Sequence, residues 1–342
     1  MKTKNRSNLK LIISASIGII LLGGMFWYVG FDKLLTAIGK ASPLWLLVSS
    51  LLLIPTWLLR AWRWKLLLIP VKKSIKISNT FWSTAIGFMI NTLIPIRIGE
   101  FIRAYILGEK EKIGFPSSIS SIVVERTLDM VGLLTLGLIL LLILPVGVSI
   151  PSWFLNAFVA LAVLVVVILV VIVVGTKREG VVLNVISRII RPISFLSKRR
   201  EKILNAVKGF FDGMKVVSQS PRLLLKTLTP TYALWILQLF IIWSIFKAFD
   251  HPASLLIILL GAVILYFTYI IPAAPGYVGS YEAYWTIIFL ALGITQIDLL
   301  LAMGLVSHLI GVITMIVLGC IGTVWLGLSF EQVFRLRRPD KV

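Results

Sequence analysis

Charged residues interrupt the most apolar part of the sequence, and their types suggest anion binding. The stretch "NTLIPIRIGEFIRAY", Asn91 to Tyr105, breaks an apolar run with a proline and a glycine and adds two arginines and a glutamate. An arginine can hold a phosphate through two parallel hydrogen bonds. A helix that begins after such a break also directs backbone N–H groups at anions. The candidate residues of an anionic-headgroup site are Arg97, Gly99, Glu100 and Arg103.

A second stretch of the same kind, "IIPAAPGYVGSYEAYW", spans Ile270 to Trp285. Pro275, Gly279 and Glu282 correspond to the proline, glycine and glutamate of the first stretch, with a spacing that differs by two residues. Paired interruptions in two halves of a membrane chain indicate a transporter's substrate site. The alternative is a pair of loop tips with interfacial charges. The second copy adds the candidates Pro275, Gly276, Gly279, Ser280 (as a helix N-cap) and Glu282.

A third stretch, "IVVERTLDMVGLL", places Glu125, Arg126 and Asp129 in a segment that must cross the membrane. Each charge there costs roughly 2.5–3.5 kcal/mol, so these side chains should face the protein interior and have partners. Arg97 and Arg103 would complete an ion-pair network of three arginines and three carboxylates. Two roles remain open for the network: it fixes the first stretch to this helix, or its carboxylates, Asp129 above all, take part in coupling.

Composition identifies the class of protein. Of 342 residues, 58% are hydrophobic and only 14% are charged, with a mean hydropathy of +1.00. Soluble domains carry about 25% charged residues, so this is an integral membrane protein. The net charge of +20 fits basic cytoplasmic loops and contact with anionic inner-leaflet lipids, rather than nucleic acid. With one cysteine and two histidines, we expect no disulfide, metal or cofactor.

The apolar segments predict an all-α, polytopic membrane protein with about seven to nine transmembrane segments. The run from Leu11 to Val29 is long enough to span and reads as a retained first helix rather than a signal peptide. The expected segments are 10–30, 43–59, 79–96, 117–144, 153–175, 228–248, 253–272, 283–293 and 297–327.

Basic residues set the orientation. They concentrate before residue 11, in 60–76, in 177–226 and after residue 334, whereas only Lys33, Lys40 and Lys247 fall in the opposite loops. Because cytoplasmic loops carry the excess of Lys and Arg, both termini should be cytoplasmic and the protein should lie in the cell membrane as a multi-pass protein.

This orientation requires 79–112 to begin and end on the cytoplasmic side, which predicts a re-entrant hairpin. It enters along 79–94, turns at Pro95–Gly99 and returns from Glu100 to about Leu107. We expect one domain, 1–342, made of pseudo-symmetric halves: 1–175, and 228–330 with a broken hairpin at 253–293. The loop 177–227 between them shows helical apolar spacing, which predicts amphipathic helices on the inner leaflet or, alternatively, a cytoplasmic helical hairpin.

Together, "NTLIPIRIGEFIRAYIL", "SSIVVERTLDMVGLL" and "PAAPGYVGSYEAYW" resemble the lysylphosphatidylglycerol synthetase/flippase transmembrane family, related to the membrane half of the MprF proteins. The resemblance covers essentially the whole chain and implies a flippase-like fold with re-entrant helices. It also implies a substrate: an anionic or aminoacylated phospholipid, or a polyprenyl-phosphate-linked sugar. Its motif positions are Pro95, Gly99, Glu100, Arg103, Glu125, Arg126, Pro275, Gly276, Gly279 and Glu282. The synthetase relatives also carry a soluble aminoacyl-transfer domain, and this sequence ends at Val342, so synthase activity is not expected.

The leading hypothesis is therefore a non-enzymatic carrier that moves such a lipid between leaflets. A membrane enzyme acting on a lipid-linked substrate and a small-anion transporter are the alternatives. The histidines, His251 and His308, have no neighbouring catalytic partners in sequence, which argues against the enzyme. We leave open a homo-oligomeric assembly, the lipid, the direction of transport and its energy source.

Overall fold

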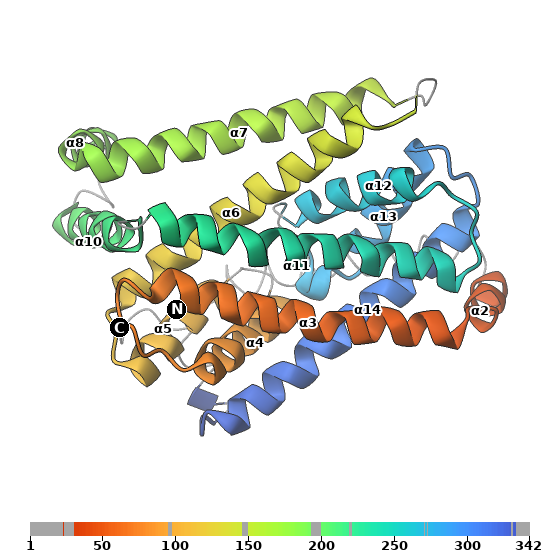
Figure 1. The fold of residues 1–342 in the computed structure, drawn as a ribbon, viewed down its shortest axis with the longest axis horizontal. Helices are drawn as coiled ribbons and strands as arrows, with labels where there is room; N and C mark the ends of the chain where they lie inside the picture. Colours follow the sequence, from red (N-terminus) through yellow and green to blue (C-terminus); the bar gives the residue numbers. More distant parts are fainter. Residues whose placement is uncertain are drawn as a thin grey trace.

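Long helices run side by side through the protein, and every regular element of the part described is helical, which confirms the all-α class (Figure 1). The computed structural model describes residues 23, 31–94, 98–145, 150–192, 200–218, 221–269, 271, 273–329 and 331–332. Apart from residue 23, the predicted first helix therefore lies outside the described residues. The long helices are α3 (Pro43–Leu68), α6 (Phe115–Leu142), α7 (Ser152–Lys177), α11 (Pro221–Ala248) and α14 (Ile297–Trp325), and the short α2 (Phe31–Gly39) crosses one end.

Several of these helices have the length and composition of membrane spans. Four stretches qualify among the described residues: Pro43–Leu68, Ser152–Lys177, Leu225–Ala248 and Ile297–Trp325. Helix α6 has 28 residues, about 42 Å at 1.5 Å per residue, but it carries the charged cluster predicted above. The longest, α14, lies inclined to α3 and α11 (Figure 1). The chain is a multi-pass membrane protein, and the total number of spans stays a prediction.

The predicted first hairpin is formed by α4 (Ile77–Leu93) and α5 (Gly99–Glu111). Their 17 and 13 residues give about 26 and 20 Å, less than the ~30 Å of a bilayer core. The return helix is longer than the predicted Glu100–Leu107. At its base, Glu111 accepts hydrogen bonds from Lys72 Nζ (2.7 Å), the Lys76 N–H (3.0 Å) and Asn79 Nδ2 (2.7 Å). Burial alone would raise the pKa of Glu111, but these bonds outweigh it and hold that pKa below its usual value.

The second hairpin is formed by α12 (Leu255–Thr268), the single turn η1 (Pro275–Tyr277) and α13 (Ser280–Ala291). Its turn needs glycine, because Gly276 has φ +62° and Gly279 has φ +75°. Gly279 is the N-cap of α13, and Ser280 is its first helical residue with no capping hydrogen bond at this end. The prediction that Ser280 caps α13 was wrong, because a serine N-cap needs extended backbone and the tight turn puts a left-handed residue there.

The two hairpins lie at opposite ends of the molecule, and the end of α4 contacts the turn of the second hairpin (Figure 1). Figure 1 shows α4 and α5 toward the end that carries α8 and α10, and α12 and α13 toward the end that carries α2. At the meeting point, a Cβ on Gly276 would lie 3.5 Å from the backbone oxygen of Thr92, near the end of α4. Irregular backbone inside a membrane is tolerated only when it is buried in protein or lines a wet cavity. The contact of η1 with the end of α4 satisfies that condition for the turn of the second hairpin.

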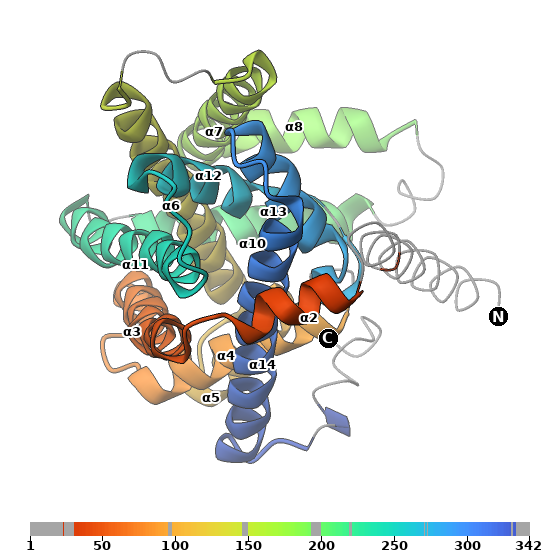
Figure 2. The ribbon, with the colours of Figure 1, turned by 90° about the vertical axis from the view of Figure 1, so that its right-hand side faces the viewer.

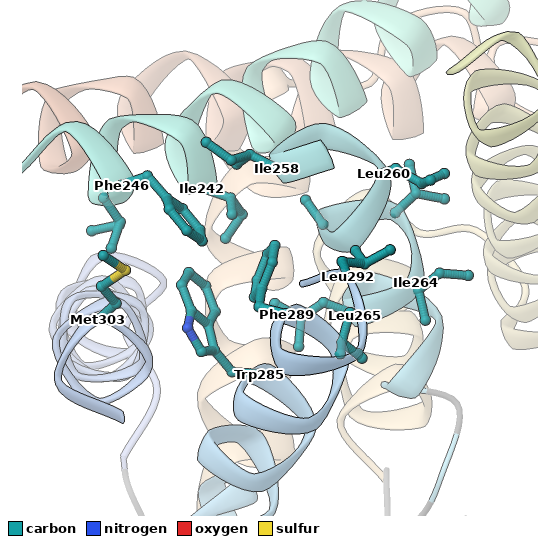
Figure 3. Close-up of a cluster of buried hydrophobic side chains, with 14 of the residues drawn as sticks. Ile242, Phe246, Ile258, Leu260, Ile264, Leu265, Trp285, Phe289, Leu292 and Met303 are labelled. Atoms are coloured by element: carbon teal, nitrogen blue, oxygen red, sulfur yellow. The ribbon is translucent and has the colours of Figure 1, made fainter. Parts of the chain in front are cut away.

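An aromatic core holds the second hairpin in place (Figure 3). Phe246 on α11 stacks on Trp285 of α13 with centroids 5.8 Å apart, and both contact Phe289 at 4.9 Å. Ile258 and Leu265 of α12 and Met303 of α14 are buried in the same cluster. The base of the hairpin is therefore packed firmly on α11 and α14.

Two helices from the predicted basic loop run crosswise to the bundle. In Figure 1, α8 (Glu179–Ile190) and α10 (Arg200–Ser218) are seen almost end-on while α7 and α11 lie in the plane, and Figure 2 shows α8 lengthwise. Lys215 of α10 pairs with Glu179 of α8 at 2.6 Å. Helix α8 exposes an apolar stripe at Val181, Val185 and Ile189. This geometry suits helices in the plane of a membrane surface, and that contact stays a prediction.

Helix α3 extends further than the sequence suggested. We expected its apolar segment to end at residue 59 and Arg60 and Arg63 to lie in a cytoplasmic loop. Instead the helix continues to Leu68, and both arginines are buried within it. The prediction failed because the first arginine marks the end of the apolar run in sequence, whereas Arg63 is ion-paired inside the protein and Arg60 packs against Phe88.

Candidate functional site

A cavity lies at the centre of the molecule, where the two hairpins approach each other. Its volume is about 240 Å³, far more than the ~10–15 Å³ that one water needs. Residues of α3, α4, α5, α6, α11, α12, η1, α13 and α14 line it. The first turns of both return helices reach it, through Glu100 of α5 and Tyr281 of α13. The meeting of half-helix ends predicted from the paired motifs is therefore present.

One wall of the cavity is charged. Glu100, Arg126 and Asp129 line it, and Arg126 pairs with Asp129 at 3.1 Å and with Glu100 at 3.5 Å. The side chain of Arg126 is 31% exposed, so it faces the cavity rather than the protein interior. Three of the predicted network residues thus meet at the proposed site.

The centre of the charged network is Arg63, a residue that sequence reasoning did not identify. Its side chain is fully buried and pairs with Glu125 at 3.0 Å and with Asp129 at 2.5 Å. Asp129 also accepts a hydrogen bond of 3.1 Å from the indole N–H of Trp235 on α11. Arg63 therefore connects α3 to α6 through two carboxylates and supplies much of the positive charge that these need.

Arg103 connects the first hairpin to the same network. It pairs with Glu100 at 2.7 Å and with Glu125 at 3.3 Å, and its guanidinium lies 4.8 Å from the ring centroid of Trp64. The side chain is buried and is not part of the cavity wall. These contacts favour the interpretation in which the network fixes α5 to α6. The other predicted partner, Arg97, lies outside the described residues.

Arg60 is the unbalanced charge of the cavity. Among the described residues it forms no ion pair with a carboxylate, whereas Arg63, Arg103 and Arg126 share Glu100, Glu125 and Asp129. Arg60 lines the cavity, and its guanidinium lies 5.1 Å from the ring centroid of Phe88, another residue of the cavity wall. The described set therefore holds four arginines against three carboxylates, so the predicted balance of three and three was incomplete.

The opposite wall is formed by the second hairpin and α14. Here His308 contacts Glu282 and the carbonyl of Gly276, each at 2.6 Å. The ring of His308 stacks on Tyr281 with centroids 4.7 Å apart. Gly276, Tyr281 and His308 line the cavity, and Glu282 lies behind them and is buried.

The remaining predicted site residues support the cavity from outside it. Gly99 is packed so closely on α4 that a Cβ there would lie 1.9 Å from the backbone oxygen of Gly87. Its N–H donates to Asn91 Oδ1 at 2.8 Å. Of the proposed substrate-binding residues, Glu100 and Gly276 line the cavity, and the described residues that do not are Gly99, Arg103, Pro275, Gly279, Ser280 and Glu282.

The functional residues missed by sequence reasoning had weak signals. Arg60 and Arg63 stand in "LLRAWRWKLLL", whose tryptophans and leucines could have shown that the apolar helix continues past them. His308 has no neighbouring catalytic partner in the sequence. Its partner Glu282 is 26 residues away on another helix, and no pattern within one helix reveals such a pair.

The fold and the cavity define a polytopic all-α membrane protein with a charged, buried site between two opposed helical hairpins. The chain belongs to the family of the lysylphosphatidylglycerol synthase transmembrane region, whose family model matches residues 9–321. The predicted resemblance is confirmed. Membership associates the chain with membrane lipids in general.

Curated relatives have low sequence identity to this chain, but two of them align over most of its length. A UPF0104 membrane protein of Methanothermobacter thermautotrophicus is 23% identical over 82% of this chain and 85% of the relative, and one of Methanocaldococcus jannaschii is 22% identical over 94% and 95%. Glycosyltransferase AglD of Haloferax volcanii is 23% identical over 35% of this chain but only 19% of AglD. No solved structure matches the chain.

Proposed function

We propose that this protein is a carrier that moves a lipid with an anionic headgroup between the two leaflets of the cell membrane. The substrate class is an anionic or aminoacylated phospholipid, or a polyprenyl-phosphate-linked glycolipid. The observation that carries this proposal is Arg60, a cavity-lining cation without a carboxylate partner among the described residues. A buried charge of this kind is costly unless it is paired or binds a ligand.

The chemistry of the cavity suits a phosphate. A guanidinium offers several N–H donors in a plane and is the side chain of choice for holding phosphate oxygens. Arg126, partly exposed beside Arg60 in the cavity wall, adds a second cation. The lipid tails would remain in the bilayer while the headgroup passes through this site.

The opposed hairpins suggest how the cavity would open to each side. The basic connections lie at the end of the bundle that carries α8 and α10 (Figure 1), so we assign this end, together with both termini, to the cytoplasm. The first hairpin then enters from the cytoplasm and the second from outside. Movement of one hairpin against the other would expose the cavity alternately, as in other transporters with broken helices.

Flipping of a fluorescent lipid in vesicles tests the proposal. Purified protein is reconstituted with fluorescent phosphatidylglycerol, and a membrane-impermeant reductant reports how fast inner-leaflet probe becomes accessible. We expect Arg60→Ala to slow flipping about tenfold or more, because a hydrogen bond to a charged group is worth about 1.5–3 kcal/mol. Arg60→Lys should retain part of the rate.

The matched control removes a positive charge outside the cavity. Lys73 is exposed in the connection between α3 and α4, so Lys73→Ala should flip lipid like the wild type. Equal rates for wild type, Arg60→Ala and protein-free vesicles would contradict the proposed function. Equal, fast rates for wild type and Arg60→Ala would remove Arg60 from the site but leave transport standing.

The two alternative functions make different predictions. A small-anion transporter would take up inorganic phosphate or sulfate, and these anions at millimolar concentration would suppress binding of phosphatidylglycerol. A membrane enzyme would convert a lipid-linked sugar, as the partial similarity to a glycosyltransferase could suggest. We propose a carrier rather than an enzyme, and turnover of a lipid-linked sugar by the pure protein would overturn that choice.

A further inference from the structure

The imidazole of His308 lies between two hydrogen-bond acceptors. Its Nδ1 is 2.6 Å from Glu282 Oε1 on α13, and its Nε2 is 2.6 Å from the carbonyl oxygen of Gly276 at the tip of the second hairpin. The carbonyl can only accept, so the Nε2 atom must carry a hydrogen. The carboxylate also accepts when it is ionised. A neutral imidazole has one N–H and cannot donate to both partners.

The geometry therefore requires one additional proton. It is held as an imidazolium beside the Glu282 carboxylate, with Nδ1–H donating to Oε1 and Nε2–H donating to the Gly276 carbonyl. Removing this proton leaves one ring nitrogen without a hydrogen. The lone pair of that nitrogen then faces a lone pair of its partner, either Glu282 Oε1 or the Gly276 carbonyl oxygen. The remaining N–H would favour the ionised carboxylate, because charge-assisted hydrogen bonds are the stronger ones. The contact that is lost is then the one to Gly276.

We propose that His308 and Glu282 form a proton-binding site whose occupancy holds the tip of the second hairpin against α14. With the proton bound, Nε2–H donates to the Gly276 carbonyl and the tip is held. With the proton released, the ring nitrogen repels that carbonyl and the tip is free to move. The two contacts of His308 thus correspond to the protonated state of the pair.

The burial of the pair favours a site for a single proton. The side chain of Glu282 is 1% exposed and that of His308 is 10% exposed. The second carboxylate oxygen of Glu282 has no hydrogen-bond partner among the described residues. A lone carboxylate in this position would be unfavourable, whereas the protonated pair carries no net charge. His308 lines the cavity, so the proton has a path to it from there.

The first hairpin provides a contrast within the same molecule. Glu100, in the first turn of α5, pairs with Arg103 at 2.7 Å and Arg126 at 3.5 Å, and arginine does not release its proton in proteins. Glu282, in the first turn of α13, instead faces a histidine, which exchanges protons near neutral pH. Among the described residues of the two hairpins, the carboxylate–histidine pair therefore occurs in the second hairpin and not in the first.

Other groups around the pair do not replace it. Tyr281 of α13 stacks on His308, Tyr269 after α12 contacts Tyr281, and Tyr277 of η1 contacts Tyr269. The charged residues of the other helices that line the same cavity are Arg60, Glu100, Arg126 and Asp129. The carboxylates among these are held by arginines, so the exchangeable proton belongs to His308 and Glu282.

The structural consequence is proton-coupled movement of the hairpin, and for a lipid carrier it means proton-coupled transport. This last step rests on the proposed function, whereas the proton site itself does not. One proton exchanged per lipid would shift the distribution of the lipid between leaflets by about tenfold per pH unit of gradient.

Nitrogen NMR of the full chain tests the proton site without reference to transport. The chain has only two histidines, and His251→Asn leaves His308 as the single ¹⁵N-histidine signal. We expect both ring nitrogens to be protonated at neutral pH, and Glu282→Gln to convert the ring to a neutral form. A wild-type ring that is already neutral and insensitive to Glu282→Gln would overturn the proposal.

A pH gradient across vesicles tests the coupling. With fluorescent phosphatidylglycerol as the probe, the wild type and His251→Asn should redistribute the lipid when the gradient is imposed, and His308→Gln should not respond. Wild-type flipping that ignores the gradient would overturn coupling while leaving the carrier function standing. A protonated His308 in a protein that flips no lipid would overturn the carrier function and the coupling, but would support the proton site.

Discussion

At the scale of single residues, the buried charges depend on Arg63. Arg63 lies on α3, is fully buried and contacts both Glu125 and Asp129 of α6. No other arginine of the described network combines these features. Two carboxylates inside a membrane protein are tolerable only with such a partner. Arg60, one turn earlier on the same helix, has no such pair among the described residues and faces the cavity. The same helix therefore supplies one arginine for structure and one that we assign to the substrate.

Replacing Arg63 should destabilise the protein strongly. We expect Arg63→Met to lower the free energy of unfolding by about 3–5 kcal/mol, because it leaves Glu125 and Asp129 without their main partner. Thermal unfolding in detergent, followed by tryptophan fluorescence, measures the change. Arg126→Gln is the control, since Arg126 is 31% exposed and its loss should cost clearly less. Equal stability of wild type and Arg63→Met would show that the network does not hold α3 to α6.

At the scale of elements, the first hairpin depends on a glycine contact between its two helices. A Cβ on Gly99 would lie 1.9 Å from the Gly87 oxygen and 2.6 Å from Asn91 Oδ1, atoms that cannot move without shifting the backbone or breaking the hydrogen bond from the Gly99 N–H. Close approach of helices at glycine is a common means of packing in membranes. The glycine that sequence reasoning assigned to the substrate site thus has a structural explanation.

A methyl group at this contact should separate α4 from α5. We expect Gly99→Ala to cost about 1–3 kcal/mol or more of unfolding free energy, as overpacking does, and to slow lipid flipping because Glu100 moves with α5. Gly180→Ala in α8 is the matched control: nothing lies within 4 Å of its added Cβ. That control should be neutral or slightly stabilising, by roughly 0.5–1 kcal/mol. A Gly99→Ala protein as stable as the Gly180→Ala protein would contradict the contact.

At the scale of the whole molecule, the order of a long helix, two short helices and a long helix occurs twice. It runs from α3 through α4 and α5 to α6, and again from α11 through α12 and α13 to α14. The two hairpins lie at opposite ends (Figure 1). We interpret the arrangement as an inverted repeat with the cavity at its centre, the geometry on which alternating exposure of a transporter site is based.

The hairpins could be predicted because their signals are local. Proline, glycine and charge in a short stretch, together with the distribution of basic loops, require a turn inside the membrane. The partners of the charges could not be predicted in the same way. Glu125 and Asp129 lie 62 and 66 positions after Arg63 in the sequence. Only the packing of α3 on α6 brings the three side chains together. Arg60 was missed for a related reason, since the segment predicted to end at residue 59 continues as a helix to Leu68.

The central claim is that an anionic lipid headgroup occupies the cavity beside Arg60. Photo-crosslinking tests it most directly: wild-type protein in vesicles is irradiated with phosphatidylglycerol that carries a diazirine in its headgroup, and mass spectrometry identifies the labelled residues. We predict labelling of cavity residues such as Trp57 and Phe88, competed by excess phosphatidylglycerol more than by phosphatidylcholine. Labelling confined to exposed residues of α7, such as Val166 and Val170, would contradict the account.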